Sequence, residues 1–184
     1  MNSEFEVLRD VVARLESAGI SYMLTGSVAM SIYAEPRMTR DIDIVVELAP
    51  SDGRRVSELF ATDYYVSEEA VRAAISDHRM FNLFNLSRLV KVDLIVLRDE
   101  EFQRHEFARR ARRELGGIAA WVISKEDLIL SKLVWAAPSE SAFQLRDVRK
   151  LLASGADEAY LRQWSIRLGV EVLLRKCMDA GYDS

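Results

Sequence analysis

Two aspartates, Asp41 and Asp43, stand at the start of an apolar run that continues as Ile44-Val45-Val46. The run predicts a strand over residues 41–48, and residues i and i+2 of a strand point to the same side. The two carboxylates therefore converge and repel each other, so they either face open water or share a cation. Carboxylate oxygens are ligands that Mg²⁺ or Mn²⁺ accepts. The pair predicts a metal site, and a solvated strand end is the structural alternative.

A third aspartate, Asp93, lies within a second predicted strand over residues 89–97. An acid in the middle of a β-branched strand is out of place by propensity. If this strand lies beside that of Asp41 and Asp43, all three carboxylates can meet and hold two metal ions. Such ions can activate an attacking hydroxyl and stabilise a leaving phosphate. The alternative is an edge-strand acid paired with Lys91 or Arg88.

Gly26-Ser27 forms a break between an apolar segment, residues 20–24, and a short predicted helix, residues 28–33. Glycine lets backbone N–H groups approach an anion closely, and the start of a helix favours a phosphate. Ser27 can donate its hydroxyl to that phosphate. An ordinary turn with a serine cap would show the same sequence.

Taken together, Thr25-Gly26-Ser27, Asp41-Ile42-Asp43 and the later Asp93 resemble the DNA polymerase β-type nucleotidyltransferase superfamily. The segment 37–44 is similar to the AbiEii-like branch, which includes toxins of bacterial toxin–antitoxin systems. The resemblance covers residues 24–152. It implies that the Gly-Ser turn grips a triphosphate, that the first two acids hold metal, and that Asp93 completes the site and helps to deprotonate the acceptor.

The same resemblance assigns roles to residues outside these motifs. Lys132 matches the triphosphate-binding lysine of the branch, and Asp147, within Arg146-Asp147-Val148, matches an acid near the site. Arg40 beside the acidic pair is a candidate for neutralising triphosphate oxygens, and a surface charge balancing the two acids is its alternative.

The elements that must position these residues follow from hydrophobic periodicity. We expect helices at 4–18, 28–33, 52–60 and 100–115, strands at 20–24, 41–48, 80–86, 89–97 and 118–123, and a short strand followed by a helix within 64–74. From Ser124 to Met178 the pattern is helical, with breaks at Pro138 and Gly155. The chain is therefore predicted to be an α/β (α+β) protein, and the resemblance implies the nucleotidyltransferase-fold mixed sheet flanked by helices. We expect an α/β domain over residues 1–123 and a helical C-terminal portion, residues 124–184, packed on it.

Composition narrows the class of protein. A net charge of −4 over 184 residues argues against a surface built wholly for nucleic acid. No apolar run approaches the roughly 20 residues that span a bilayer. The single cysteine, Cys177, cannot form an internal disulfide, and the N-terminus does not resemble a secretion signal. These features predict a cytoplasmic protein with no membrane partner.

The leading hypothesis is transfer of a nucleoside monophosphate from a nucleoside triphosphate to an acceptor hydroxyl, with Mg²⁺ or Mn²⁺ as cofactor. The acceptor stays open among tRNA or another RNA, a protein side chain and a small molecule. The branch also implies a possible antitoxin partner. One alternative is a non-catalytic module that binds a nucleotide or a partner on the same fold. Another is a different transferase that uses Asp-x-Asp, such as a glycosyltransferase, and the Gly-Ser turn favours the first hypothesis over it.

Overall fold

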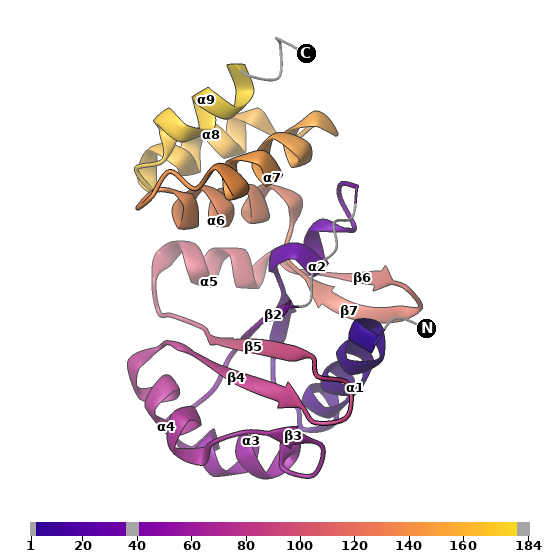
Figure 1. Ribbon diagram of the computed structural model, residues 1–184. Helices are drawn as coiled ribbons and strands as arrows, with labels where there is room; N and C mark the ends of the chain where they lie inside the picture. The colour runs from indigo at the N-terminus through magenta and orange to yellow at the C-terminus, as the bar shows by residue number, and fades with distance from the viewer. Residues whose placement is uncertain (1–2, 36–40, 180–184) are drawn as a thin grey trace. The chain divides into compact units, whose positions relative to one another are not determined.

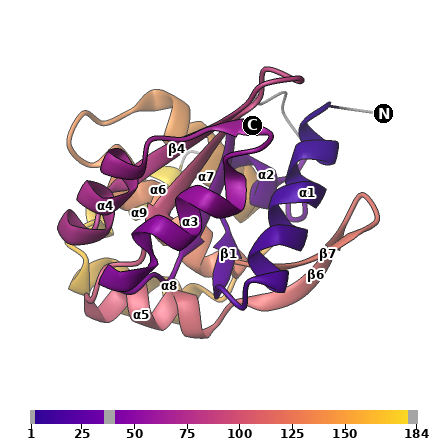
Figure 2. The same cartoon turned by 90° about the horizontal axis from the view of Figure 1, so that it is seen from below.

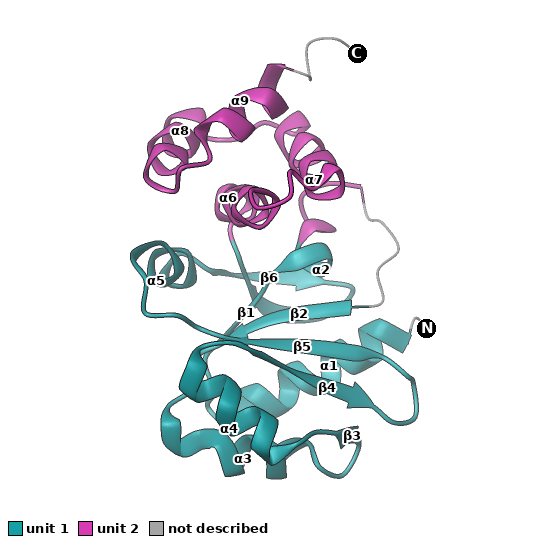
Figure 3. Cartoon of the chain, turned by 60° about the vertical axis from the view of Figure 1, so that its left-hand side comes forward, with its two compact units in different colours: residues 1–29, 37–123 teal, residues 30–36, 124–184 magenta. Residues whose placement is uncertain are grey.

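The computed structural model describes residues 3–35 and 41–179, which divide by contact into two compact units. Unit 1 comprises residues 1–29 and 37–123, and unit 2 comprises residues 30–36 and 124–184 (Figure 3). The segment 30–36 contacts unit 2 although it lies within the N-terminal part of the sequence. The expected domains, residues 1–123 and 124–184, stay a prediction.

Unit 1 is built on a mixed sheet that contains seven strands among the described residues, in the order β3-β4-β5-β2-β1-β7-β6 (Figure 1). The strands are β1 (Tyr22–Leu24), β2 (Asp41–Val46), β3 (Tyr64–Tyr65), β4 (Met80–Asn85), β5 (Lys91–Val96), β6 (Ala111–Leu115) and β7 (Ile118–Val122). The pairs β2–β5 and β1–β7 are parallel, and the other neighbouring pairs are antiparallel. The predicted α/β class with a mixed sheet is confirmed.

Helices lie on both sides of this sheet. They are α1 (Ser3–Ser17), α2 (Gly26–Met30), the 3₁₀ turn η1 (Pro50–Asp52), α3 (Gly53–Phe60), α4 (Glu68–Asp77) and α5 (Glu101–Ala108). Figures 1 and 3 show α1, α3 and α4 on one side of the sheet and α2 and α5 on the other, and Figure 2 views the first group from below.

The two faces of the sheet differ in chemistry because successive strand residues point to opposite sides. The hydroxyl of Tyr64 donates to Asp10 of α1 at 2.7 Å, so the face that carries Tyr64 is the one covered by α1. Strand registers place the buried side chains of Leu83, Val92 and Ile42 on that apolar face. The opposite face carries the polar residues of β2 and β5.

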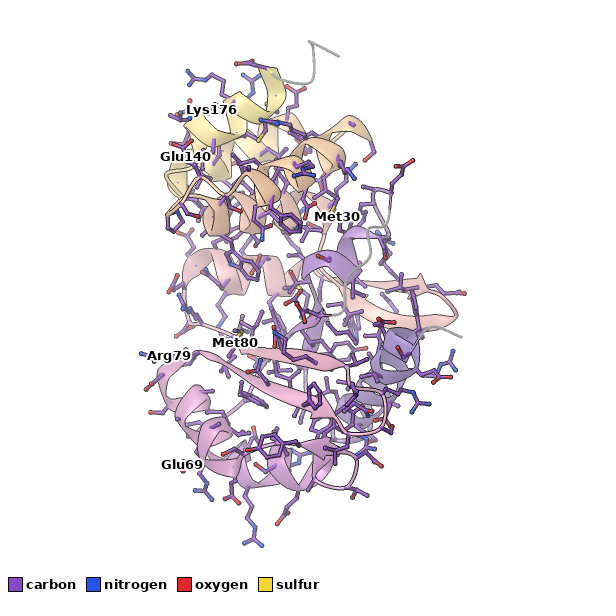
Figure 4. All side chains as sticks on the ribbon, viewed as in Figure 1. Met30, Glu69, Arg79, Met80, Glu140 and Lys176 are labelled. Atoms are coloured by element: carbon purple, nitrogen blue, oxygen red, sulfur yellow. The ribbon has the colours of Figure 1, made fainter. Side chains whose placement is uncertain are left out.

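Unit 2 is helical, with α6 (Lys125–Ala136), α7 (Ala142–Ala153), α8 (Glu158–Arg167) and α9 (Glu171–Asp179). Ser124 caps α6, because its hydroxyl oxygen accepts from the Asp127 amide at 3.2 Å. The fully buried Asp127 also accepts from the Ser124 hydroxyl at 2.6 Å and from the Tyr160 hydroxyl of α8. At the surface, Lys176 of α9 pairs with Glu140 at 3.1 Å (Figure 4). Among the described residues, no helix has the length and apolar character needed to cross a bilayer.

The predicted helix over residues 100–115 is wrong in its second half. Helix α5 ends at Ala108, and residues 111–115 form β6, which pairs with β7 in a hairpin. Gly116 and Gly117 connect the two strands with φ of +56° and +79°, the backbone that a tight two-residue hairpin turn requires. Arg104 therefore lies on α5 and Arg112 on β6, while Arg109 and Arg110 lie between the two elements.

Two boundaries also differ from expectation. Helix α2 begins at Gly26 rather than at Val28, so Ser27 lies inside its first turn. A further break separates α8 from α9 at Gly169, where φ is +69° and the backbone can reverse without a Cβ clash.

Candidate active site

The register of β2 against β5 brings the predicted acids together on one face of the sheet. In this parallel pair Asp43 is opposite Asp93, and Asp41 is opposite Lys91. Neighbouring strands lie about 4.8 Å apart, and register partners in a parallel pair project to the same side. Asp41, Asp43 and Asp93 therefore share the polar face, with Asp43 and Asp93 as direct neighbours.

Asp93 is the most enclosed of the three acids, with 8% of its side chain exposed against 56% for Asp41. Strand β5 is interior to the sheet, between β4 and β2, so the alternative is wrong about an edge strand, although the pairing of Asp93 with Lys91 that it named is present. One carboxylate oxygen, Oδ1, accepts a hydrogen bond from the side-chain amide of Asn82 on β4, its register partner. The other, Oδ2, lies 3.0 Å from the ammonium nitrogen of Lys91.

Lys91 is the cation of this acidic face. Its Nζ lies 3.0 Å from Asp93 Oδ2 and 3.7 Å from Asp41 Oδ1. The hydrogen bond to Asp93 is the largest cause of a raised Lys91 pKa; partial burial opposes the rise, and the charges of Asp93, Asp41 and Asp43 add to it. One ammonium group is therefore stabilised in its charged form by the nearby carboxylates of both strands.

Gly26 packs directly against Asp43. A Cβ built on Gly26 would lie 2.0 Å from Asp43 Oδ2 and 2.7 Å from Asp43 Cγ, far inside contact distance. The φ of Gly26 is +62°, a left-handed conformation that favours glycine. The Thr25 amide also donates to the Asp43 carbonyl at 3.0 Å, which ties the turn to β2. The glycine turn and the Asp-x-Asp strand are therefore one local structure.

This face fits a hard divalent cation by the chemistry of its donors. Carboxylates from two adjacent strands would provide its oxygen ligands, and two of these carboxylates are register partners. The acids do not stand as a ready ligand cluster: within the described part of the chain, no three acidic, histidine or cysteine side chains are grouped in that way. An ammonium group lies among them instead.

The other predicted residues are Lys132, Asp147, Arg40 and Ser27. Lys132 and Asp147 belong to unit 2, where Lys132 Nζ on α6 and Asp147 Oδ2 on α7 are 2.8 Å apart and both side chains are almost fully buried. Gln144 accepts from the same ammonium at 3.2 Å. Arg40 lies outside the described residues. Ser27, next to Gly26, is buried.

Two residues of this face were not predicted as part of the site. Lys91 was expected only as the ion-pair partner of Asp93 in the structural alternative, and no role was expected for Asn82. The spacing of Lys91 two positions before Asp93 already places both side chains on one face of a strand. Asn82 could be found only through the register of β4 against β5, which no local pattern encodes.

Several solved structures share the fold of this chain at low sequence identity. The chain is similar to a nucleotidyltransferase-like antigenic protein from Paracoccidioides brasiliensis, with a TM-score of 0.55 and 17% identity over 95% of this chain and 93% of that one. It is also similar to the lincosamide adenylyltransferase LnuA with bound lincomycin, with a TM-score of 0.53 and 13% identity over 82% and 98%. A third is ANT(2'')-Ia in complex with adenylyl-2''-tobramycin, with a TM-score of 0.52 and 14% identity over 97% and 99%. The nucleotidyltransferase fold is thereby confirmed.

The family follows from the sequence of the chain as a whole. Residues 10–175 match the model of the family described as nucleotidyl transferase AbiEii toxin, type IV toxin–antitoxin system. The chain belongs to this family and is a nucleotidyltransferase. Among curated proteins, none matches it by sequence.

Proposed function

We propose that the chain transfers a nucleoside monophosphate from a nucleoside triphosphate to an acceptor hydroxyl, releases pyrophosphate, and depends on Mg²⁺ or Mn²⁺ held by Asp41, Asp43 and Asp93. The observation that carries the proposal is the register of β2 and β5, in which Asp43 and Asp93 are direct partners on one face while Gly26 abuts Asp43. Family membership supports nucleotidyl transfer. The non-catalytic and glycosyltransferase alternatives have no comparable support.

Each residue has a distinct role in this proposal. Asp41 and Asp43 supply oxygen ligands, and a divalent cation held there offsets the charge of the triphosphate. Asp93, the most enclosed acid, orients the acceptor hydroxyl and accepts its proton. Gly26 and Ser27 receive the β- and γ-phosphates beside Asp43.

The roles of residues beyond this face are extensions of the same proposal. Lys132 offsets triphosphate charge, and Asp147 holds its ammonium in place through their 2.8 Å contact. Arg40 contributes a further positive charge next to Asp41. Most of the rate enhancement then comes from positioning and electrostatic stabilisation, as in other phosphoryl-transfer sites.

The proposal is tested by Asp43→Ala, assayed for pyrophosphate release with Mg²⁺, a triphosphate and a heat-treated cell lysate as the source of acceptor. We expect loss of turnover with an unchanged circular dichroism spectrum, because Asp43 lies at the polar surface of its strand. Asp77→Asn is the matched control, since Asp77 is a half-exposed acid at the end of α4, on the other side of the sheet (Figure 1). Turnover that persists in Asp43→Ala would refute the mechanism.

The acceptor and the nucleotide are identified in the same system. Incubation with each α-labelled triphosphate, Mg²⁺ and either total RNA or protein-free metabolites shows which fraction becomes labelled. LnuA and ANT(2'')-Ia, of the same fold, were solved with lincomycin and with adenylyl-2''-tobramycin, so small hydroxylated molecules belong in the screen beside tRNA.

We further propose a toxin role, countered by an antitoxin partner, because the family description names a toxin of a type IV system. Induced expression of the wild type is then expected to arrest growth, whereas Asp43→Ala at the same protein level is not. Equal growth of the two cultures would show that nucleotidyl transfer by this chain does not cause a toxic effect.

A further inference from the structure

Lys91 occupies the part of the acidic face where a divalent cation would have to bind. It is the register partner of Asp41 and stands two residues before Asp93 on the same strand. Its side chain therefore projects from the same face of the sheet as the three acids. Its Nζ lies within 4 Å of carboxylate oxygens from two different strands, at 3.0 Å from Asp93 and 3.7 Å from Asp41. An ion pair that held a single acid would not bridge β5 and β2 in this way.

The hydrogen bonds of Asp93 show what metal binding must displace. Its two carboxylate oxygens are shared between the Asn82 amide and the Lys91 ammonium. With 8% of the side chain exposed, water alone cannot solvate this carboxylate if both donors leave. Lys91 is 40% exposed on a long flexible stem, so it can turn toward solvent.

Resting on the function proposed above, we infer that Lys91 is a resident countercation that offsets part of the negative charge of the three carboxylates when no metal is bound, and that it competes with the divalent cation for Asp93 and Asp41. A divalent cation bound at Asp93 Oδ2 would repel the ammonium that lies 3.0 Å from the same oxygen, so each lowers the affinity of the other for this carboxylate. Lys91 thus stabilises the metal-free fold and lowers the affinity for metal.

Two other roles for Lys91 make different predictions. A purely structural ion pair would make its removal destabilising with or without metal, and would leave metal affinity unchanged or weaker. A lysine that binds only the triphosphate would change nucleotide affinity but not the binding of metal alone. The affinity for Mn²⁺ without nucleotide therefore separates the three.

The expected effect is moderate because the ammonium is partly exposed and screened. For a charge 3–4 Å from two carboxylates at a protein surface, we expect its removal to tighten Mn²⁺ binding by about tenfold. The same change should lower the melting temperature in EDTA, because three repelling carboxylates lose their counterion, and should enlarge the rise in melting temperature caused by Mn²⁺.

The test is titration calorimetry with Mn²⁺ alone on the full chain, at fixed ionic strength. Lys91→Met removes the charge and keeps the length of the side chain, and Lys91→Arg keeps the charge. Arg88→Met is the matched control: it removes one positive charge from the same β4–β5 hairpin, where Arg88 pairs with Glu6 at 2.6 Å rather than with the three acids. Lys91→Gln is the second variant if Lys91→Met does not fold.

We expect tighter Mn²⁺ binding in Lys91→Met, with Lys91→Arg and Arg88→Met close to the wild type. Unchanged or weaker binding in Lys91→Met, in a protein where Asp43→Asn abolishes Mn²⁺ binding, would overturn the inference and leave the proposed function intact. Equal tightening in Arg88→Met would also overturn it, because the effect would then reflect net charge. Binding that is insensitive to Asp43→Asn would instead count against the proposed function itself.

Discussion

Replacement of Gly26 by alanine tests whether the glycine turn positions Asp43. The new Cβ would lie 2.0 Å from Asp43 Oδ2, whereas carbon contacts settle near 3.5 Å, so the carboxylate must move by roughly 1 Å or more. A displacement of about 1 Å at a reacting centre can cost about 10²-fold in rate. We therefore expect Gly26→Ala to lower kcat/KM for pyrophosphate release about a hundredfold.

The same change also costs stability, because alanine at a φ of +62° is strained by about 1–2 kcal/mol. For a chain of this size that lowers the melting temperature by about 2–8 °C. Gly19→Ala is the matched control, since Gly19 has nearly the same φ, +64°, but nothing within 4 Å of the added Cβ. We expect the control to lose stability and keep activity. If Gly26→Ala were as active as Gly19→Ala, the turn would not be positioning Asp43.

The remaining predictions concern the interior of unit 2. Lys132→Met leaves the carboxylate of Asp147 buried without its cation, so it should lower the free energy of unfolding by about 3–5 kcal/mol in urea titrations. The double variant with Asp147→Leu should recover much of that loss, and simple additivity of the two single losses would argue against a coupled pair. The thiol of Cys177 is 1% exposed and burial raises its pKa, so it should resist a thiol reagent at pH 8 in the native protein and react fully in denaturant. Rapid labelling of the folded chain would show that the helices around it open readily.

The acidic face could be predicted from sequence because it follows from short-range rules. Alternation along a strand places Asp41 with Asp43, and the resemblance connects them to Asp93 and to Gly26. The close contact between Gly26 and Asp43 and the position of Lys91 beside the acids depend on tertiary packing and on strand register. Neither can be read from the residue pattern of one strand. Residue types thus indicated the chemistry of the face, and pairing between strands determined its charge balance.

The hairpin β6–β7 shows where pattern reasoning failed. The periodicity predicts one helix over residues 100–115, although Gly116-Gly117 followed by an apolar run is a signal for a two-residue turn. In the structure, arginines of this segment form ion pairs with different acids. Arg104 pairs with Glu47 at 2.6 Å, and Arg112 pairs with Glu16 at 2.5 Å. These long-range ion pairs tie α5 and β6 to other elements of unit 1, and a helical periodicity cannot reveal them.

Lys132 illustrates the opposite case, in which the family likeness suggested more than the local pattern. Lysine side chains are mostly exposed, yet that of Lys132 is 4% exposed and paired with Asp147. A buried charge costs several kcal/mol unless it is paired, which is why both residues must be present together. This coupling between α6 and α7 depends on tertiary packing, so the residues could be selected from the sequence but their contact could not.

The central claim is that Asp41, Asp43 and Asp93 bind divalent metal as one site. The most direct measurement is the anomalous scattering of Mn²⁺ in crystals grown with Mn²⁺ and a non-hydrolysable triphosphate. In the wild type we predict anomalous density for the ion in contact with carboxylate oxygens from both β2 and β5. In crystals of Asp93→Asn we predict that this density disappears or moves so that the ion contacts β2 alone. Well-ordered Mn²⁺ and triphosphate bound elsewhere, with Asp41 and Asp93 still paired to Lys91, would contradict the account.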